Sequence, residues 1–218
     1  MHWLTGQFCE HSKELIYRKT ITSRVQFDSC LSLVISASIF GMFSISDYGL
    51  LGLTNEYYLL LTMRVVVVVL CLFLALIIRR WGGYANRTWL HVLPLWILAT
   101  GIILIVPLRP DSLSTQTTAV VVATMAFYLL IPNLLTVVTI ASLYLSVGFI
   151  ISAVLFADIT PVVTLRIALL LIMANAVGFF ALLRLESLQR KQFSLLHEER
   201  HQNCTLLKEI AHRKSLET

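Results

Sequence analysis

Charged residues are scarce in this sequence. Only 13% of its 218 residues are Asp, Glu, Lys or Arg, whereas soluble domains carry about 25%. Hydrophobic residues make up 57% of the chain, and its mean hydropathy is +0.81. This composition excludes an ordinary soluble domain. It predicts an all-α membrane protein, because the apolar runs have the length of about 20 residues that a helix needs to cross a bilayer.

Clustered metal or redox ligands are also lacking. The four cysteines lie singly, without the close pairs that metal and redox sites use: Cys9, Cys30, Cys71 and Cys204. One short motif, His197-Glu-Glu-Arg-His201, matches the H-E-x-x-H pattern of zinc proteases. It lies in a charged segment with no third ligand, so we interpret it as coincidental. We expect no metal and no cofactor.

Six apolar segments are candidates for transmembrane helices: Phe27–Ser46, Tyr57–Ile78, Trp89–Pro107, Thr117–Ile131, Leu134–Phe156 and Val162–Leu183. The fourth is short, about 22 Å at helical rise, unless it begins near Leu113. A single helix from Thr117 to Phe156 would be about 60 Å long, twice the bilayer thickness. We therefore expect a tight hairpin at Pro132-Asn133.

Basic residues are unevenly distributed between the loops. They precede the first segment and separate the second from the third: Lys13, Arg18, Lys19, Arg24, Arg79, Arg80 and Arg87. The alternate loops hold acidic residues and a single basic one: Asp47, Glu56, Asp111, Asp158 and Arg109. The positive-inside rule then places both termini in the cytoplasm. Because the basic residues border the membrane and form no stripe, we expect no nucleic-acid partner.

The N-terminal residues 7–25 mix apolar and basic side chains. Two interpretations are equally supported: a short helix lying on the inner membrane face, in contact with anionic lipid headgroups, or a polar extension of the first span. We therefore expect membrane lipids to be partners of the chain.

Two arginines, Arg64 and Arg166, lie well inside the expected spans. An arginine at such a depth costs several kcal/mol unless it faces a partner or a wet cavity. Each could pair with an outer carboxylate, or the two could form one wall of an outward-facing pocket for a small anionic or amphipathic ligand. The candidate ligand-binding residues are Arg64, Arg166, Asp47, Glu56, Asp158, Tyr57 and Tyr58, although an interfacial aromatic belt explains the tyrosines equally well.

The sixth segment carries a stripe of small residues, Ala174, Gly178 and Ala181, which lets helices approach closely. Either a dimer axis or packing within one bundle would use it. The charged helix that follows has leucines at an eleven-residue spacing, and such a repeat relaxes a coiled coil toward straight rods with two nearly equivalent registers. We expect a parallel homodimer here, with a solitary amphipathic helix or a frayed tail as alternatives. The expected contact residues are Leu185, Leu188, Leu195, Leu196, Leu206, Leu207 and Ile210.

The sequence Glu209-Ile-Ala-His-Arg-Lys-Ser-Leu-Glu217 resembles the E-I-A-x-R-K-x-x-E linker that often precedes diguanylate cyclase, sensor or histidine-kinase modules in bacterial membrane receptors. The resemblance implies a dimeric signalling receptor of the bacterial inner membrane, with residues 1–26 as a cytoplasmic N-terminal segment, 27–183 as a six-helix sensor domain and 184–218 as a coiled-coil linker. It also implies a diguanylate cyclase, which makes cyclic di-GMP, as the output domain.

The chain contains no G-G-D-E-F segment, no phosphorylatable kinase helix and no nucleotide-binding glycine loop. We therefore expect this chain not to be an enzyme and its output domain to lie beyond Thr218. A histidine kinase or adenylate cyclase is the alternative output. A transporter or channel subunit and a passive membrane anchor are the alternative functions.

Overall fold

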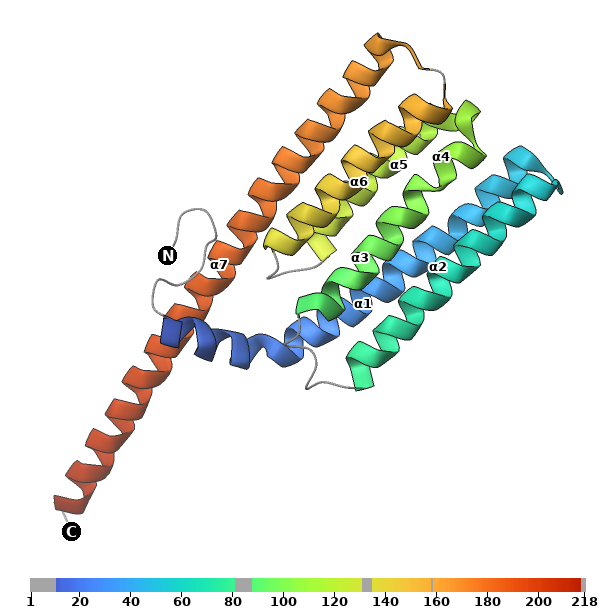
Figure 1. The fold of residues 1–218 in the computed structure, drawn as a ribbon. Helices are drawn as coiled ribbons and strands as arrows, with labels where there is room; N and C mark the ends of the chain where they lie inside the picture. Colours follow the sequence, from blue (N-terminus) through green and yellow to red (C-terminus); the bar gives the residue numbers. More distant parts are fainter. Residues whose placement is uncertain (1–10, 81–87, 131–134, 158, 217–218) are drawn as a thin grey trace. The chain divides into compact units, whose positions relative to one another are not determined.

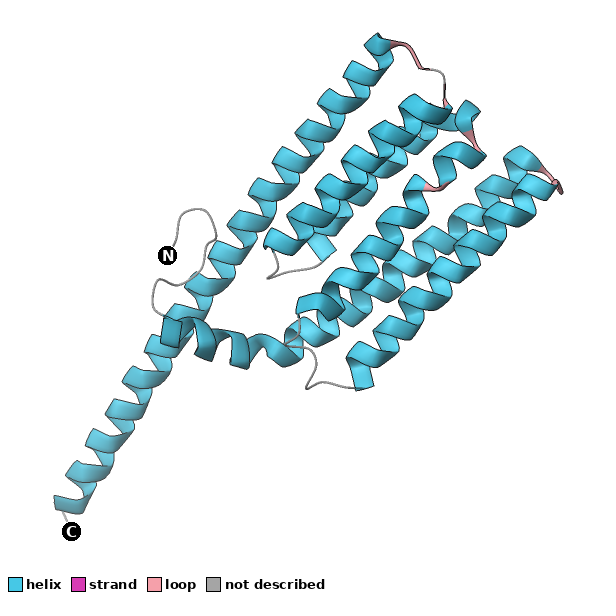
Figure 2. Cartoon of the chain, in the orientation of Figure 1, coloured by secondary structure: helices cyan, strands magenta, loops and turns pink. Residues whose placement is uncertain are grey.

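The computed structural model describes residues 11–80, 88–130, 135–157 and 159–216. Within these ranges it consists of helices and contains no strand (Figure 2). The chain divides into two compact units, one of residues 21–182 and the other of residues 1–20 together with 183–218. The first unit is a helical bundle.

The helices follow the apolar segments closely (Figure 1). They are α1 (His11–Leu51), α2 (Asn55–Arg80), α3 (Thr88–Ile103), α4 (Ile105–Leu108), the 3-10 turn η2 (Pro110–Ser112), α5 (Leu113–Leu130), α6 (Leu135–Phe156) and α7 (Pro161–Leu216). Helix α5 begins at Leu113, the start that the short fourth segment needed. The expected hairpin at Pro132-Asn133 lies outside the described residues.

Several helices are long and apolar enough to cross a membrane, as in a multi-pass membrane protein. Four meet this condition alone: Val25–Leu51, Asn55–Arg80, Leu135–Phe156 and Pro161–Ile210. The segments Val92–Leu108 and Pro110–Leu129 meet it together and are bent by 113° at the break between them. Counted over the described residues, this gives four spans, or up to five if the bent pair is one span. Six spans and cytoplasmic termini remain predictions.

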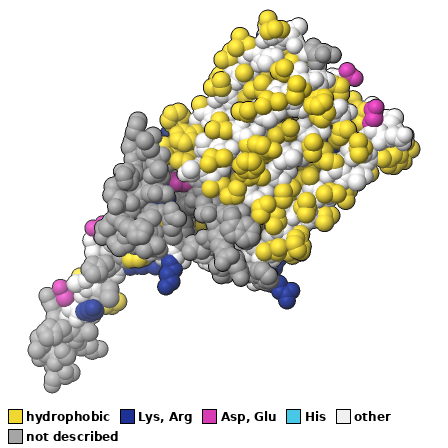
Figure 3. Space-filling model, in the orientation of Figure 1, with side chains coloured by type: hydrophobic (Ala, Val, Ile, Leu, Met, Phe, Trp, Pro, Cys, Tyr) yellow, Lys and Arg dark blue, Asp and Glu magenta, His cyan; other side chains and the backbone are white. Residues whose placement is uncertain are grey.

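The bundle buries small and aliphatic residues between its helices and leaves large apolar residues outside. Helix α6 packs against α3 and α5, and α2 packs against α3. On α1 and α2, Leu33, Ala75 and Ile78 form a buried cluster. Figure 3 shows hydrophobic side chains spread over the outer face of the bundle. A surface of this kind suits contact with lipid rather than water.

A short turn joins α1 to α2. Gly52 has φ 61°, the left-handed conformation that commonly ends a helix, and its N–H donates to the carbonyl of Tyr48 at 2.9 Å. The hydroxyl of Thr54 accepts a hydrogen bond from the N–H of Tyr57 at 3.3 Å, as an N-cap residue does. The turn therefore fixes how the end of α1 faces the start of α2.

The second unit pairs the N-terminal end of α1 with the charged part of α7. Helix α1 covers residues 11–25 of the N-terminal segment, so those residues are helical. Residues 7–10, and the side chains of Lys13, Arg18 and Arg24, lie outside what the structure describes. Contact of this helix with lipid remains a prediction.

Candidate functional site

A buried carboxylate and a buried guanidinium meet where α1 and α2 come together at their turn. The Nε of Arg64 donates to Oδ2 of Asp47 at 2.6 Å, and the two side chains are only 5% and 2% exposed. Asp47 lies four residues before the end of α1, while Arg64 is the tenth residue of α2. The short turn places them opposite one another.

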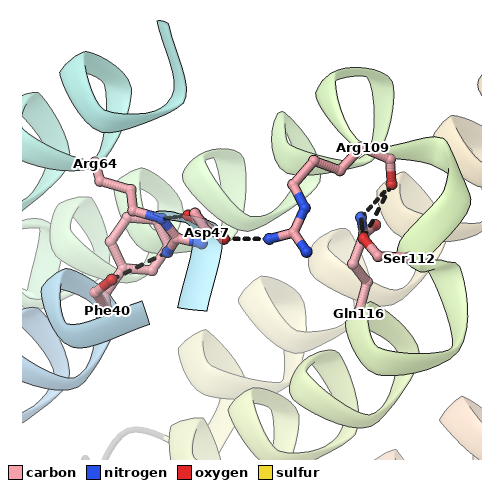
Figure 4. Close-up of polar contacts among 6 residues, drawn as sticks. All are labelled: Phe40, Asp47, Arg64, Arg109, Ser112 and Gln116. Atoms are coloured by element: carbon pink, nitrogen blue, oxygen red, sulfur yellow. Dashed lines mark hydrogen bonds and ion pairs between the residues drawn. The ribbon is translucent and has the colours of Figure 1, made fainter. Parts of the chain in front are cut away.

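A second arginine binds the other oxygen of the same carboxylate. Nη1 of Arg109 donates to Oδ1 of Asp47 (Figure 4). Arg109 follows α4, and its own carbonyl accepts hydrogen bonds from Nε2 of Gln116 at 2.6 Å and from the hydroxyl of Ser112 at 3.2 Å. The same Nε2 donates to Oγ of Ser112 at 2.9 Å. These bonds fold the α4–α5 connection around Arg109 and hold its backbone in place.

Arg64 has further partners on α1. Its Nη1 donates to the carbonyl of Phe40 at 3.0 Å. Its guanidinium carbon lies 4.8 Å from the ring centroid of Phe40 and 5.9 Å from that of Phe43. Rings at this distance attract a cation through their negative faces. Arg64 is therefore held by a carboxylate, a carbonyl and two aromatic rings.

The site has one positive charge in excess, because two guanidiniums share one carboxylate. An arginine carries five N–H donors. Among the described residues, the Nε and Nη2 groups of Arg109 have no hydrogen-bond partner. The side chain of Arg109 is 9% exposed, against 2% for that of Asp47. Nη2 of Arg64 likewise has no described hydrogen-bond partner, but Arg109 is the more exposed of the two arginines, and a carboxylate or phosphate oxygen suits its donors chemically.

The structure assembles only part of the set of ligand-binding residues expected from the sequence. It pairs Arg64 with Asp47, the first of the two alternatives for that arginine. Glu56 is exposed, and Arg166 is exposed with no ion pair among the described residues. Asp158 lies outside the described residues.

The expected tyrosines form an aromatic row near the α1–α2 turn. Tyr57 is half-buried, whereas Tyr58 is 52% exposed. The ring of Tyr57 meets those of Tyr48 and Tyr58 edge-on, with centroids 5.7 and 5.8 Å apart. None of these rings has a described contact with the Asp47 cluster.

Sequence reasoning missed Arg109. The sequence did contain one indication of its role: Arg109 is the one basic residue in loops that otherwise hold acidic side chains. A lone cation in such a loop can serve as partner to a nearby carboxylate rather than to solvent. Arg109 and Asp47 are 62 residues apart in the sequence, so no local pattern connected them.

A second polar cluster joins α5, α6 and α7 around Asn175. Its Oδ1 accepts hydrogen bonds from the hydroxyls of Ser142 at 2.7 Å and Tyr128 at 3.2 Å. Its Nδ2 donates to Oγ of Ser146 and to the carbonyl of Leu171, both at 2.8 Å. All four hydrogen-bonding positions of the amide are filled, so this cluster holds helices together and leaves nothing to bind a ligand.

Two of the three small residues in the stripe on α7 pack inside the chain. Ala174 is 3% exposed, and a Cβ added at Gly178 would lie 2.3 Å from Cδ2 of Tyr128. The chain's own α5 therefore covers Gly178, which corresponds to the alternative of packing within one bundle. Ala181 is exposed.

The leucines expected in a coiled coil are all exposed on α7. Their exposed fractions run from 37% to 67%: Leu185, Leu188, Leu195, Leu196, Leu206, Leu207 and Ile210. They form an apolar face without a partner in the described part of this single chain. Contact with a second copy remains a prediction.

The described residues contain no group of three or more His, Cys, Asp or Glu side chains that could hold a metal ion. The side chains of His197 and His201 are not among those described.

Comparison with known proteins finds no matching family model, no similar curated protein and no similar solved structure.

Proposed function

We propose that this chain is the transmembrane input module of a dimeric bacterial signalling receptor of the inner membrane, and that α7 carries the signal out of the bundle. The observation that supports this most strongly is the continuity of α7. It runs without interruption from Pro161 to Leu216, over 56 residues, or about 84 Å at the usual helical rise. Its first part is apolar, and its second part is charged with an exposed row of leucines. A rotation of the first part would reach the second because the backbone hydrogen bonds between them are unbroken.

The input site in this proposal is the Asp47–Arg64–Arg109 cluster. Its excess positive charge and the free donors of Arg109 favour a small anionic or amphipathic ligand. The ligand would compete with Asp47 for Arg109. Since Asp47 and Arg64 are held by α1 and α2 while Arg109 follows α4, that competition would change how these helices are tied together.

The output in this proposal is a diguanylate cyclase beyond Thr218, as the linker resemblance implies. The charged part of α7, residues 184–216, is called the rod from here on. Two copies of the rod would set how two catalytic domains face one another. A histidine kinase or adenylate cyclase on the same rod would equally require α7 to pair and to carry the signal out of the bundle. If the chain were only a passive anchor, changes in the Asp47–Arg64–Arg109 cluster would leave the output unchanged.

The rod is tested by cysteine crosslinking in native membranes. Single cysteines at positions 185–207, in a background without the four native cysteines, should crosslink between copies with an eleven-residue period. A flat profile, or no crosslinks, would count against a paired rod.

The input site is tested in the full-length parent by measuring the product of its output domain. Arg109→Gln should change the output because it removes the ligand-binding donors. Arg166→Gln, which removes the same charge from an exposed position, is the matched comparison. Unchanged output from Arg109→Gln, with the protein present in the membrane at parental levels, would favour the passive anchor.

A further inference from the structure

The rod carries a charged pair that is buried. Nη1 of Arg190 donates to Oε2 of Glu186 at 3.0 Å, one helical turn apart, and each residue is 2% exposed. Neighbouring side chains on the same stretch of α7, including Arg184 and Lys191, are exposed. Charged side chains on a single helix are almost never fully buried unless another segment covers them.

The N-terminal end of α1 supplies that cover. Tyr17 is 2% exposed, and its ring meets that of Phe193 edge-on, with centroids 5.1 Å apart and planes at 72°. The guanidinium carbon of Arg190 lies 5.3 Å from the centroid of the same Tyr17 ring. One tyrosine thus makes an aromatic contact and a cation–π contact with the rod.

The covered face and the leucine face of the rod are different. Glu186, Arg190 and Phe193 are spaced four and three residues apart and therefore share one face of the helix. Leu188, Leu195 and Leu206 lie roughly half a turn away from Glu186 at about 100° per residue, and they are 50%, 67% and 54% exposed. Leu196, three residues after Phe193, instead borders the covered face. The docked N-terminal helix therefore leaves the row of Leu188, Leu195 and Leu206 open to a second rod.

We propose that the segment Ile16–Thr20 is a clasp: by packing Tyr17 against Arg190 and Phe193 it holds the first turns of the rod and selects one of its two packing registers. The inference rests on the proposed function, because register selection requires a paired rod. It adds a second point of control, located on the N-terminal segment and separate from the Asp47 cluster.

The chemistry of the clasp makes it reversible. Burying Glu186 and Arg190 removes both charges from water, and that cost offsets the gain from their mutual attraction and the aromatic contact. When the clasp opens, both charges regain water, which offsets part of the contacts that are lost. A covering contact made only of aliphatic side chains would have no such compensation on opening.

Docking is tested by amide hydrogen exchange on the full chain in lipid nanodiscs. Phe193→Ala removes the ring that Tyr17 meets, and we expect at least tenfold faster exchange in peptides covering residues 16–24. Lys191→Ala, an exposed change two residues away, should leave these peptides unchanged. Parental exchange rates in Phe193→Ala would overturn the clasp.

Register selection is tested by the crosslinking profile of cysteines at positions 188, 195, 196 and 206, measured with and without Phe193→Ala. We expect the order of crosslinking rates among these positions to change by at least twofold, and to stay parental with Lys191→Ala. Crosslinks that form between copies but keep the same order in Phe193→Ala would overturn the clasp alone. Absence of crosslinks in every variant would instead overturn the paired rod of the proposed function, and register selection with it.

Discussion

Asp47 neutralises one of two arginines and cannot neutralise both. Its two oxygens are used by Arg64 and Arg109, so each guanidinium depends on the same carboxylate. Removing one partner from a buried ionic group leaves uncompensated charge, which costs more than the intact interaction contributes. The residue is therefore the point at which this end of the bundle is most sensitive to a change of charge.

Asp47→Asn should lower the free energy of unfolding by about 3 to 5 kcal/mol, because the buried Arg64 and the part-buried Arg109 lose their only described counter-charge. The measurement is denaturant unfolding in detergent micelles. Glu56→Gln removes the same charge from an exposed side chain nearby and should change stability by no more than about 0.5 kcal/mol. Equal effects from the two variants would mean that the pairing of Asp47 contributes nothing to stability.

At Gly178 the bundle has no room for one more carbon. In Gly178→Ala the new Cβ would meet the Tyr128 ring at 2.3 Å, so the ring must move and the variant should lose about 1 to 3 kcal/mol, the usual cost of overpacking. Gly49→Ala, where nothing lies within 4 Å of the added carbon, should be neutral or stabilise by up to about 1 kcal/mol through better helix propensity. Thermal unfolding of both variants in the same detergent compares them. A neutral Gly178→Ala would show that α5 and α7 are not closely packed there.

Along the rod, helix α7 has two different faces. One is covered by the N-terminal end of α1 and includes a buried ion pair, and the other exposes leucines. A helix with a strict seven-residue repeat turns its apolar row gradually around its axis, whereas a repeat of eleven keeps that row nearly straight. The phase of the leucines, rather than the length of the rod, should then decide whether two copies pair.

Deletion of residues 194–204 removes eleven positions and brings Leu206 and Leu207 to the places of Leu195 and Leu196. Because eleven residues make about three full turns, crosslinking between copies should persist within about twofold of the parent. Deletion of residues 194–202 removes nine positions and rotates the remaining leucines by about half a turn, so crosslinking should fall at least tenfold. The readout is disulfide formation at a cysteine placed at position 188. Similar yields from the two deletions would argue that the phase of the repeat does not matter.

For the molecule as a whole, the sequence predicted the helices well and their mutual contacts poorly. The described residues of five of the six apolar segments each lie within one helix, and the third is divided between α3 and α4. Apolar runs of this length satisfy their backbone hydrogen bonds most simply as helices. The pairing of Arg64 with Asp47 was among the expected alternatives because both lie close to one short turn. Arg109 was missed. The sequence also left open whether Gly178 packs inside one bundle, as it does against Tyr128, or at a dimer axis. Helices that are apolar all round give no periodic signal of which face meets which neighbour.

The number of spans decides on which side the two ends of the molecule lie. Charge asymmetry predicts six spans and both termini in the cytoplasm. If α3, α4 and α5 together cross only once, the odd number would put the termini on opposite sides. Fusions of a fluorescent protein that matures only in the cytoplasm, made separately at each terminus, should both fluoresce. Fluorescence from one terminus alone would establish an odd number of spans.

The left-handed Gly52 and the three-residue turn around it limit where this chain can accept extra length. Asp47 and Arg64 are 17 residues apart, and nearly all of that interval is helix with a fixed rotation per residue. One residue inserted into the first turns of α2, before Arg64, would swing Arg64 by about 100° around its helix and away from the carboxylate. An affinity tag or a fluorophore site placed at this corner would thus change the charge inside the bundle, although the corner itself is exposed to solvent.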